Sequence, residues 1–273
     1  MAGDQRELVA ALFDRTADTY DRTGVELFQP IADRLVAELA PRTGERALDV
    51  GCGRGAALFM LARAVGPEGR AVGVDLSPRM VAATAKEATD AGLQVVIRVG
   101  DAQKPPFEDE VFDLVASSLV IFFLPDPLAA LRAWRELLVP EGRVGVSTFG
   151  DFSPAWKEVD KVFAAYIPTQ MADPRTQSAE TPFASDAGVE RLLVEAGFTD
   201  VRTTTVTVPV RFDDAEHWER WTWSVGQRRM WEAVPADERR HVREAAYAQL
   251  DRCRDGDGRI GFDQVARFTL GRR

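Results

Sequence analysis

Three closely spaced glycines, Gly51, Gly53 and Gly55, follow a short apolar stretch and precede a helical pattern. Glycine permits a tight turn and leaves no Cβ atom between the backbone and a ligand. The helix that begins directly after the turn presents unpaired N–H groups and the positive end of its dipole. Because open α/β sheets bind ligands at the carboxyl ends of their strands, this segment predicts a ligand site at the end of the first strand.

The residues of this loop leave the kind of ligand open. The spacing Gly51-x-Gly53-x-x-Ala56 satisfies the dinucleotide pattern and is compatible with an NAD-dependent oxidoreductase. Asp49, two residues before the first glycine, suits a cationic ligand better than a pyrophosphate. A second acidic signal, Asp101, follows the third predicted strand, and the dinucleotide pattern does not require it.

Two side chains outside the loop are candidate catalytic residues. His217 lies in the aromatic segment FDDAEHWERWTW. It is a candidate general base or hydrogen-bond partner of a substrate, and the alternative is an ordinary histidine on a helix surface. Tyr20 lies in the segment FDRTADTYD. Either its hydroxyl contacts a ligand, or Tyr20 is a core residue whose hydroxyl reaches solvent.

Four of the six tryptophans fall within 14 residues. Trp218 and Trp221 share a helical face and are expected to pack against the sheet. Trp223 and Trp231 lie off that face, so one of them could line a substrate pocket. An aromatic wall suits a flat apolar ligand, or a cationic one through cation–π attraction.

The elements that must position these residues alternate between strands and helices. Short apolar runs occupy residues 46–50, 70–75, 94–99, 111–117 and 143–149. Helical patterns separate these runs, which predicts βαβ units and a mostly parallel sheet. Three helix starts carry an N-cap residue before a proline, namely Ser77-Pro78, Asp126-Pro127 and Ser153-Pro154.

One domain spanning 1–273 is expected, with four parts. Residues 1–45 form a helical cap, and residues 46–150 form the cofactor-binding core. Residues 151–185 are either a lid over a pocket or a plain helical connection. Residues 186–273 complete the sheet with strands near 201–208 and 259–270, and two helical patterns lie between these strands, near 214–225 and 236–252.

Composition excludes several classes of protein. The net charge of −9 argues against a nucleic-acid partner bound by a broad basic face. The longest apolar stretch, residues 114–124, spans 11 residues, whereas a membrane helix needs about 20. Two cysteines cannot form a disulfide framework or a cysteine metal cluster, so no metal is expected. The N-terminus lacks the pattern of a secretory signal, which predicts a cytoplasmic protein.

Four motifs occur in order: LDVGCGRG, VGVDLS, GDAQKPPFEDEVFDLV and LLVPEGRVGVST. In this order and spacing the chain resembles the class I S-adenosylmethionine-dependent methyltransferases, in the small-molecule branch that includes ubiquinone and menaquinone biosynthesis. The resemblance covers residues 10–150 best. It implies a Rossmann-like α/β fold with a seven-stranded sheet of order 3-2-1-4-5-7-6, the last strand antiparallel, and helical additions that form a cap or lid.

The resemblance also implies roles around the glycine loop. Gly51 and Gly53 are expected beside the amino-acid part of S-adenosylmethionine, and Asp49 is expected to bind its amino group. Asp75, at the end of the second strand, is expected to accept hydrogen bonds from both ribose hydroxyls, which requires two acceptor oxygens.

Further roles follow for the adenine and for the wall of the site. Leu76 and Met80 are expected to pack on the adenine, while Asp101 and the Ala102 N–H are expected to bind its edge. Ser117 is expected to border the methionine part. Many relatives carry polar residues or histidine after strand four, whereas residues 119–124 are apolar here, which puts a general base from this segment in doubt.

The implied function is methyl transfer from S-adenosylmethionine to a small, largely apolar or aromatic molecule, in specialised natural-product biosynthesis. In-line displacement depends mainly on proximity and orientation. An NAD-dependent oxidoreductase and a non-catalytic cofactor-binding module are the alternatives. The sequence leaves open whether oxygen, nitrogen or carbon accepts the methyl group, and it leaves the oligomeric state open.

Overall fold

One seven-stranded sheet organises the chain in the computed structural model, which describes residues 2–107, 111–167 and 181–273. Its strands are β1 (Arg46–Val50), β2 (Arg70–Asp75), β3 (Val95–Val99), β4 (Phe112–Ser118), β5 (Leu138–Phe152), β6 (Thr199–Phe212) and β7 (Ile260–Arg272). Their order is β3-β2-β1-β4-β5-β7-β6, and β7 runs antiparallel to both of its neighbours. The predicted order and direction are confirmed.

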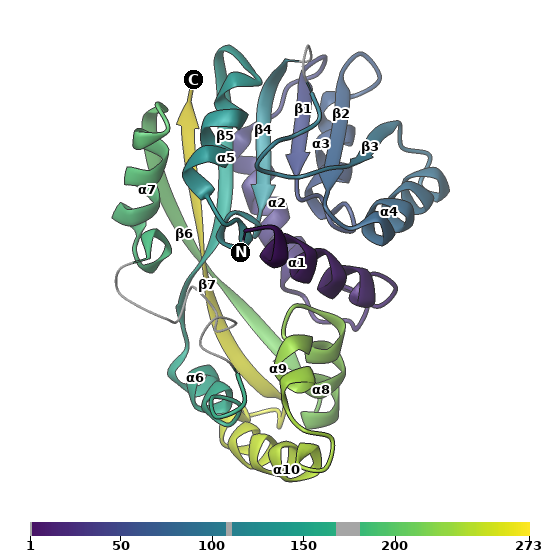
Figure 1. Ribbon diagram of the computed structural model, residues 1–273, viewed down its shortest axis with the longest axis vertical. Coiled ribbons are helices and arrows are strands. Elements are labelled where there is room, and N and C mark those ends of the chain that lie inside the picture. Colours follow the sequence, from purple (N-terminus) through teal and green to yellow (C-terminus); the bar gives the residue numbers. More distant parts are fainter. Residues whose placement is uncertain (1, 108–110, 168–180) are drawn as a thin grey trace.

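The strands match their predicted positions, but β5 is longer than the predicted segment 143–149. Pro140, Glu141 and Gly142 have the composition of a turn, yet Leu138 pairs with Phe112 and the strand continues after a register shift. Glu141 absorbs the irregularity with a left-handed backbone, φ 63°. Because β5, β6 and β7 are all long, they extend well beyond the five-residue strands β1 and β3 (Figure 1).

Helices cover both faces of the sheet, with α2 and α3 on one face and α5 and α7 on the other (Figure 1). The helices are α1 (Ala2–Thr16), α2 (Phe28–Leu39), α3 (Ala56–Val65), α4 (Pro78–Asp90), α5 (Pro127–Glu136), α6 (Pro154–Lys161), α7 (Asp186–Glu195), α8 (Ala215–Ser224), α9 (Arg228–Ala233) and α10 (Arg239–Leu250). The predicted caps are confirmed, since Ser77, Asp126 and Ser153 each accept a backbone N–H of the first helical turn.

The extended ends of β5, β6 and β7 carry α6, α8, α9 and α10, and we call this group the lower lobe (Figure 1). Helix α1 crosses between the lower lobe and the carboxyl ends of β1 and β4 (Figure 1). Only part of the expected lid at 151–185 is described. Its helix α6 packs Trp156 against Trp221 and Phe262, whereas Pro168 and Pro174 lie outside the described residues.

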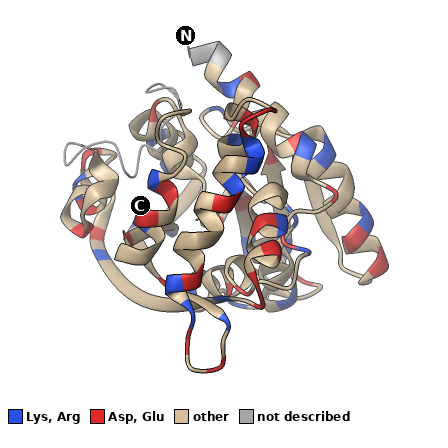
Figure 2. Ribbon diagram, turned by 90° about the horizontal axis from the view of Figure 1, so that it is seen from below, with Lys and Arg blue, Asp and Glu red and all other residues tan. Residues whose placement is uncertain are grey.

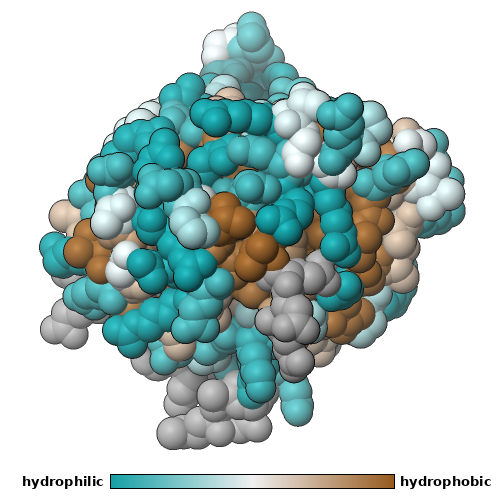
Figure 3. Space-filling model, turned by 90° about the horizontal axis from the view of Figure 1, so that it is seen from above, coloured by the Kyte–Doolittle hydropathy of each residue, from teal (hydrophilic) through white to brown (hydrophobic). Residues whose placement is uncertain are grey.

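The surface shows no strong separation by charge or hydropathy. Basic and acidic residues are interspersed along the ribbon in Figure 2. In Figure 3, hydrophobic side chains reach the surface in small groups among hydrophilic ones. Within the described ranges, none of the helices is both long enough and apolar enough to cross a membrane.

Candidate cofactor and substrate site

Two adjoining cavities lie at the carboxyl ends of β1, β2 and β4. The first, of about 100 Å³, contacts α1, and we call it the α1 cavity; its walls include Val9, Phe13, Asp75, Met80, Asp101 and Leu124. The second, of about 310 Å³, surrounds the glycine loop, and we call it the loop cavity; its walls include Asp21, Arg22, Asp49, Cys52, Arg54 and Glu87. The residues that line both cavities are Tyr20, Gly51, Gly53, Ser118 and Leu119.

The backbone of the glycine loop needs its glycines. Gly51, Gly53 and Gly55 all have positive φ angles, of 72°, 47° and 85°, a region that costs other residues free energy. A Cβ atom on Gly51 would also overlap the Val120 side chain, so that position is closed to larger residues. A Cβ atom on Gly53 would meet nothing within 4 Å, because this residue faces open space.

Asp49, on β1, is a buried carboxylate without a partner. Its side chain is 1% exposed, and neither carboxylate oxygen has a hydrogen-bond partner of good geometry among the described residues. Burial, together with the nearby Asp75 carboxylate, raises its pKa to about 7, against a smaller opposite effect of the Leu58 backbone N–H. A buried carboxylate normally needs a cation or several donors, so the loop cavity is suited to a positively charged group beside Asp49.

Asp75 ends β2 and holds the glycine loop in place. Its two oxygens accept the backbone N–H groups of Gly53, at 2.8 Å, and Ser77, at 2.9 Å. Burial nevertheless raises the pKa of Asp75. The following residues Leu76 and Met80 form the neighbouring wall of the α1 cavity, as predicted for an apolar contact surface.

Asp101 and Ala102 follow β3 and also line the α1 cavity. Asp101 accepts the backbone N–H of Gln103 at 2.9 Å and forms a 2.5 Å ion pair with Arg6 of α1. The Ala102 carbonyl accepts the indole N–H of Trp134 at 2.7 Å, which fixes this turn against α5.

The wall after β4 differs from the prediction by one residue. Ser117 is fully buried and donates its hydroxyl to the Val50 carbonyl at 3.1 Å, and it lines neither cavity. Ser118 and Leu119 line both cavities instead. Leu119 adopts a left-handed backbone, φ 59°, and its N–H donates to the Ser147 hydroxyl at 3.0 Å. The apolar character predicted for this wall is confirmed by Phe123, which lines the α1 cavity.

Tyr20 stands where the two cavities meet. Its ring packs against Phe13 and Phe28, with centroid distances of 6.0 and 5.1 Å. Burial raises the pKa of Tyr20 strongly, and the carboxylates of Asp21 and Asp75 add to this effect. The phenol therefore stays protonated and can donate a hydrogen bond but cannot act as a base near neutral pH.

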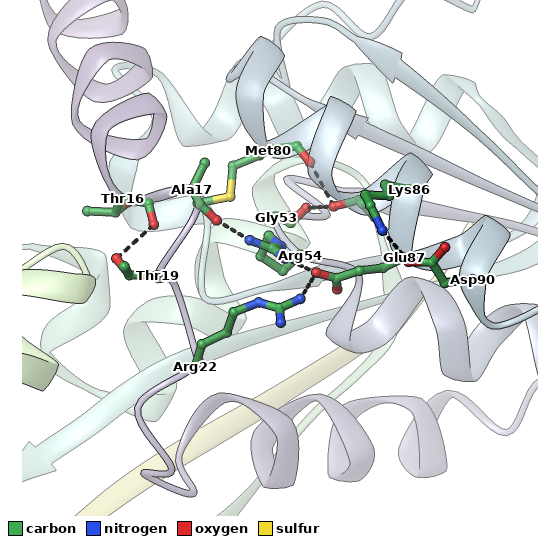
Figure 4. Close-up of polar contacts among 11 residues, drawn as sticks. Thr16, Ala17, Thr19, Arg22, Gly53, Arg54, Met80, Lys86, Glu87 and Asp90 are labelled. Atoms are coloured by element: carbon green, nitrogen blue, oxygen red, sulfur yellow. Dashed lines mark hydrogen bonds and ion pairs between the residues drawn. The ribbon is translucent and has the colours of Figure 1, made fainter.

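Ionic contacts attach the N-terminal cap, residues 2–27, to the glycine loop. Arg54, within the loop, donates to the Ala17 carbonyl and pairs with Glu87 of α4 (Figure 4). Arg22 of the cap pairs with the same Glu87 carboxylate (Figure 4). Asp18 of the cap also forms an ion pair with Arg79 of α4, at 2.5 Å. Glu87 therefore joins the cap to the glycine loop through Arg22 and Arg54, and Arg79–Asp18 is a separate, exposed pair.

His217 is buried rather than on a helix surface, and it lines neither cavity. Its Nδ1 accepts the Asp213 backbone N–H at 3.2 Å, and its Nε2 lies 2.8 Å from the Thr23 carbonyl oxygen. A carbonyl can only accept, so Nε2 carries the proton in this arrangement. The imidazole thus joins α8 to the end of the cap.

The tryptophan cluster is a packing core. Trp218 and Trp221 are buried as expected. Trp231 is also fully buried and stacks on Trp223, with 5.9 Å between the ring centroids. The Arg228 guanidinium lies over the Trp223 ring. None of these four tryptophans lines the two cavities, so the expected aromatic pocket wall comes from phenylalanines of the cap and of the segment after β4 instead.

Comparison with known proteins gives this arrangement a family. A family model described as a methyltransferase domain matches residues 48–146. The nocamycin O-methyltransferase of Saccharothrix syringae is 39% identical over 242 residues, which cover 85% of this chain and 86% of that protein. The aklanonic acid methyltransferase DauC of Streptomyces sp. (strain C5) is 44% identical over 144 residues, which cover 52% of this chain and 66% of that protein.

The chain belongs to the class I S-adenosylmethionine-dependent methyltransferases. It is an enzyme, and S-adenosylmethionine is its methyl donor. The fold agrees, since the solved YcgJ protein of Bacillus subtilis superimposes with a TM-score of 0.60 at 18% identity, over 89% of this chain and 98% of that one. Family membership removes the NAD-dependent oxidoreductase that the glycine spacing alone left open.

The sequence did not identify Asp21, Arg22, Arg54 or Glu87 as site residues. Asp21 and Arg54 adjoin the predicted residues Tyr20 and Gly53, and Arg22 lies two positions from Tyr20, which is the signal that the sequence offers for them. Glu87 lies within α4 and reaches the site only through its contacts with the two arginines (Figure 4).

Proposed function

We propose that this methyltransferase transfers the methyl group to an oxygen atom of a small, largely apolar or aromatic natural product of the polyketide type. Two relatives support the acceptor class by name, one an O-methyltransferase of nocamycin and one a methyltransferase of aklanonic acid. The observation that carries the placement of the reaction is Asp49, whose buried carboxylate lacks a partner beside the glycine loop.

In this proposal the loop cavity holds the amino-acid part of the cofactor. The Asp49 carboxylate binds the ammonium group, which satisfies the buried charge. Gly51 and Gly53 lie against the same part because they present no side chain. Asp75 binds the ribose hydroxyls, for which its two oxygens are suited.

The α1 cavity holds the adenine. Leu76 and Met80 supply apolar surface, and the Ala102 N–H and Asp101 supply polar contacts at the ring edge. Asp101 then shares its carboxylate between Arg6 and the adenine amine. Ser117 acts indirectly, since its hydroxyl bond to the Val50 carbonyl fixes the strand end that leads into the loop.

The acceptor approaches where the cavities meet, beside Tyr20 and the apolar wall. The bound cofactor supplies a methyl group on a positively charged sulfur. An acceptor oxygen held beside Tyr20 would take this methyl group, the sulfur would keep the electron pair of the broken bond, and a hydroxyl acceptor would release its proton to water. Holding the three atoms in line can supply about 7–11 kcal/mol of the barrier reduction.

Two residues orient this step in the proposal. Tyr20, which stays protonated, donates a hydrogen bond to an oxygen atom of the acceptor or of the cofactor. His217, proposed from the sequence as a base or a substrate partner, is better suited to hold the cap through Thr23. An acceptor that is already ionised would need no base at all.

Calorimetry and a transfer assay test the proposal together. S-adenosylmethionine and S-adenosylhomocysteine should each bind at one site, and NAD should not bind. With methyl-labelled S-adenosylmethionine, label should appear as an oxygen-linked methyl group on hydroxylated or carboxylated aromatic polyketides. Label that reaches only amine acceptors would contradict the oxygen assignment, and absence of cofactor binding would contradict the proposed site.

A further inference from the structure

The charges that line the two cavities do not balance. Eight charged side chains face them, three arginines and five carboxylates: Arg6, Arg22, Arg54, Asp21, Asp49, Asp75, Glu87 and Asp101. Two of the carboxylates form ion pairs with all three arginines. Glu87 pairs with Arg22 and Arg54, and Asp101 pairs with Arg6.

Three carboxylates remain without a cation among the described residues, and they are Asp21, Asp49 and Asp75. The proposed function already gives two of them a ligand group, the ammonium for Asp49 and the ribose hydroxyls for Asp75. Asp21 is left over. No hydrogen bond or ion pair of its carboxylate is found in the described part of the chain.

The backbone at Asp21 is also unusual. Its φ of 54° lies in the left-handed region, which costs a non-glycine residue free energy, although aspartate and asparagine tolerate it best. Leu119, on the opposite wall, is left-handed as well, and both residues line the loop cavity. Such strain tends to gather at functional sites.

The surroundings of Asp21 contain no free cation. The neighbouring arginines Arg22 and Arg54 are held by Glu87, and Asp18 pairs with Arg79 (Figure 4 shows the first two). The loop cavity is also lined by the phenol of Tyr20 and the carboxylate of Asp49, and the Asp75 carboxylate lies near Tyr20 on the side of the α1 cavity. Burial raises the pKa of Asp21 to about 6, so it is ionised at pH 8.

In S-adenosylmethionine the charged sulfur lies between the adenosyl part and the amino-acid part. If these parts occupy the α1 cavity and the loop cavity, the sulfur would lie where the cavities meet, at Tyr20. The Asp21 carboxylate lines the loop cavity and is near enough to the Tyr20 phenol to raise its pKa. This step rests on the proposed placement of the cofactor.

We propose that the Asp21 carboxylate is the counter-charge of the sulfonium and makes the site prefer the charged methyl donor over its neutral thioether product. After methyl transfer the sulfur is uncharged, and the attraction to Asp21 is lost. The product is therefore held less tightly than the donor, which favours exchange after each turnover.

The test compares ligands that differ in this one charge, at pH 8. Calorimetric dissociation constants are measured for S-adenosylmethionine, for S-adenosylhomocysteine and for sinefungin, in which a protonated amine replaces the methylated sulfur. In Asp21→Asn, affinity for the two charged ligands should fall about tenfold or more, as expected for one partly screened charge pair. Affinity for S-adenosylhomocysteine should change less than about twofold.

The matched control is Asp18→Asn, which removes an exposed carboxylate from the same cap segment and should leave the ligand preference unchanged. Asparagine tolerates the left-handed backbone, and unchanged binding of S-adenosylhomocysteine reports that the site remains folded. An equal loss for charged and neutral ligands in Asp21→Asn would overturn the proposal and leave the cofactor site standing. Failure of the unaltered protein to bind any of the three would overturn both.

Discussion

The carboxyl end of the sheet and the lower lobe hold their carboxylates in different ways. At the carboxyl ends of β1 and β2, Asp49 is buried and Asp75 is half-buried, and neither has a cation among the described residues. In the lower lobe, by contrast, Glu219 of α8 is held by Arg243 at 2.7 Å and by the Tyr247 hydroxyl at 2.6 Å. Carboxylates without a cation therefore mark the end proposed to receive a ligand, whereas the Glu219 carboxylate of the lower lobe has its cation within the fold.

This contrast carries a thermodynamic meaning. An unpaired buried carboxylate destabilises the ligand-free fold and is stabilised when a cation binds. A carboxylate that is already paired adds to the stability of the fold and does little for a ligand. Substitutions at the two ends should therefore affect binding and stability in opposite ways.

The largest effect is expected for Asp49→Asn. The change removes the proposed partner of the ammonium group, and affinity for S-adenosylmethionine should fall about a hundredfold. The ligand-free variant should melt at a higher temperature than the unaltered protein, because an uncompensated buried charge is gone. Calorimetry and thermal unfolding measure both, with Asp90→Asn as an exposed control. Weaker binding together with a lower melting temperature would break the comparison.

The same carboxylate predicts a dependence on pH. In the folded protein the pKa of Asp49 is raised to about 7, whereas in the unfolded chain the carboxyl group has its ordinary pKa of 3.8. Between these values the folded state binds more protons, so stability of the ligand-free protein should fall as pH rises from about 4 to 7. The raised pKa values of Asp75 and Asp21 act in the same direction.

Cofactor binding reverses this linkage, because a bound cation favours the ionised carboxylate. Affinity for S-adenosylmethionine should rise about tenfold from pH 5 to pH 8, with release of protons on binding. Titrations in buffers of different ionisation enthalpy measure that release. Proton uptake, or affinity that falls with pH, would contradict the assignment.

A smaller effect of the opposite kind is expected in the lower lobe. Glu219→Gln weakens the contacts to Arg243 and Tyr247 and should lower the free energy of unfolding by about 1–2 kcal/mol. Affinity for S-adenosylmethionine should stay the same, since Glu219 lines neither cavity. Chemical denaturation measures the change, with the exposed Glu216→Gln on the same helix as control. A loss of cofactor affinity would show that the two ends are coupled.

The smallest effect on stability is expected for His217→Ala. This residue lies between the two regions, because it joins α8 of the lower lobe to the cap. Loss of the bond to the Thr23 carbonyl should cost about 1 kcal/mol of stability and speed amide exchange in the cap. His241→Ala, at an exposed position, is the control. A changed pH–rate profile with unchanged cap exchange would instead restore His217 as a base.

The sequence predicted best what is local. The helix caps at Ser77 and Asp126 and the positions of Asp49 and Asp75 depend on motifs of a few residues, whereas the strand order was predicted from the resemblance to a family. The extension of β5 was not predicted, because Leu138 pairs with Phe112 of β4 and the strand continues through the turn composition at residues 140–142.

Residues whose environment depends on distant partners could not be predicted. His217 reads as a surface histidine until the Thr23 carbonyl, 194 positions away, is placed beside it. Ser117 and Ser118 differ in which side of the strand they face. Ser117 therefore bonds to the Val50 carbonyl, and Ser118 lines the cavities. Asp21 was not predicted because the sequence does not show that Glu87 pairs with both neighbouring arginines, Arg22 and Arg54, and so leaves Asp21 without a cation.

The attachment of the cap has a consequence for the effect of salt. Two of its ties are exposed ion pairs, Arg79 with Asp18 and Arg15 with Glu232 of α9. Dissolved salt screens such pairs, whereas it hardly reaches charges inside a cavity. Rising ionic strength is therefore expected to loosen the attachment of the cap and to leave the charges around the proposed cofactor site largely unchanged.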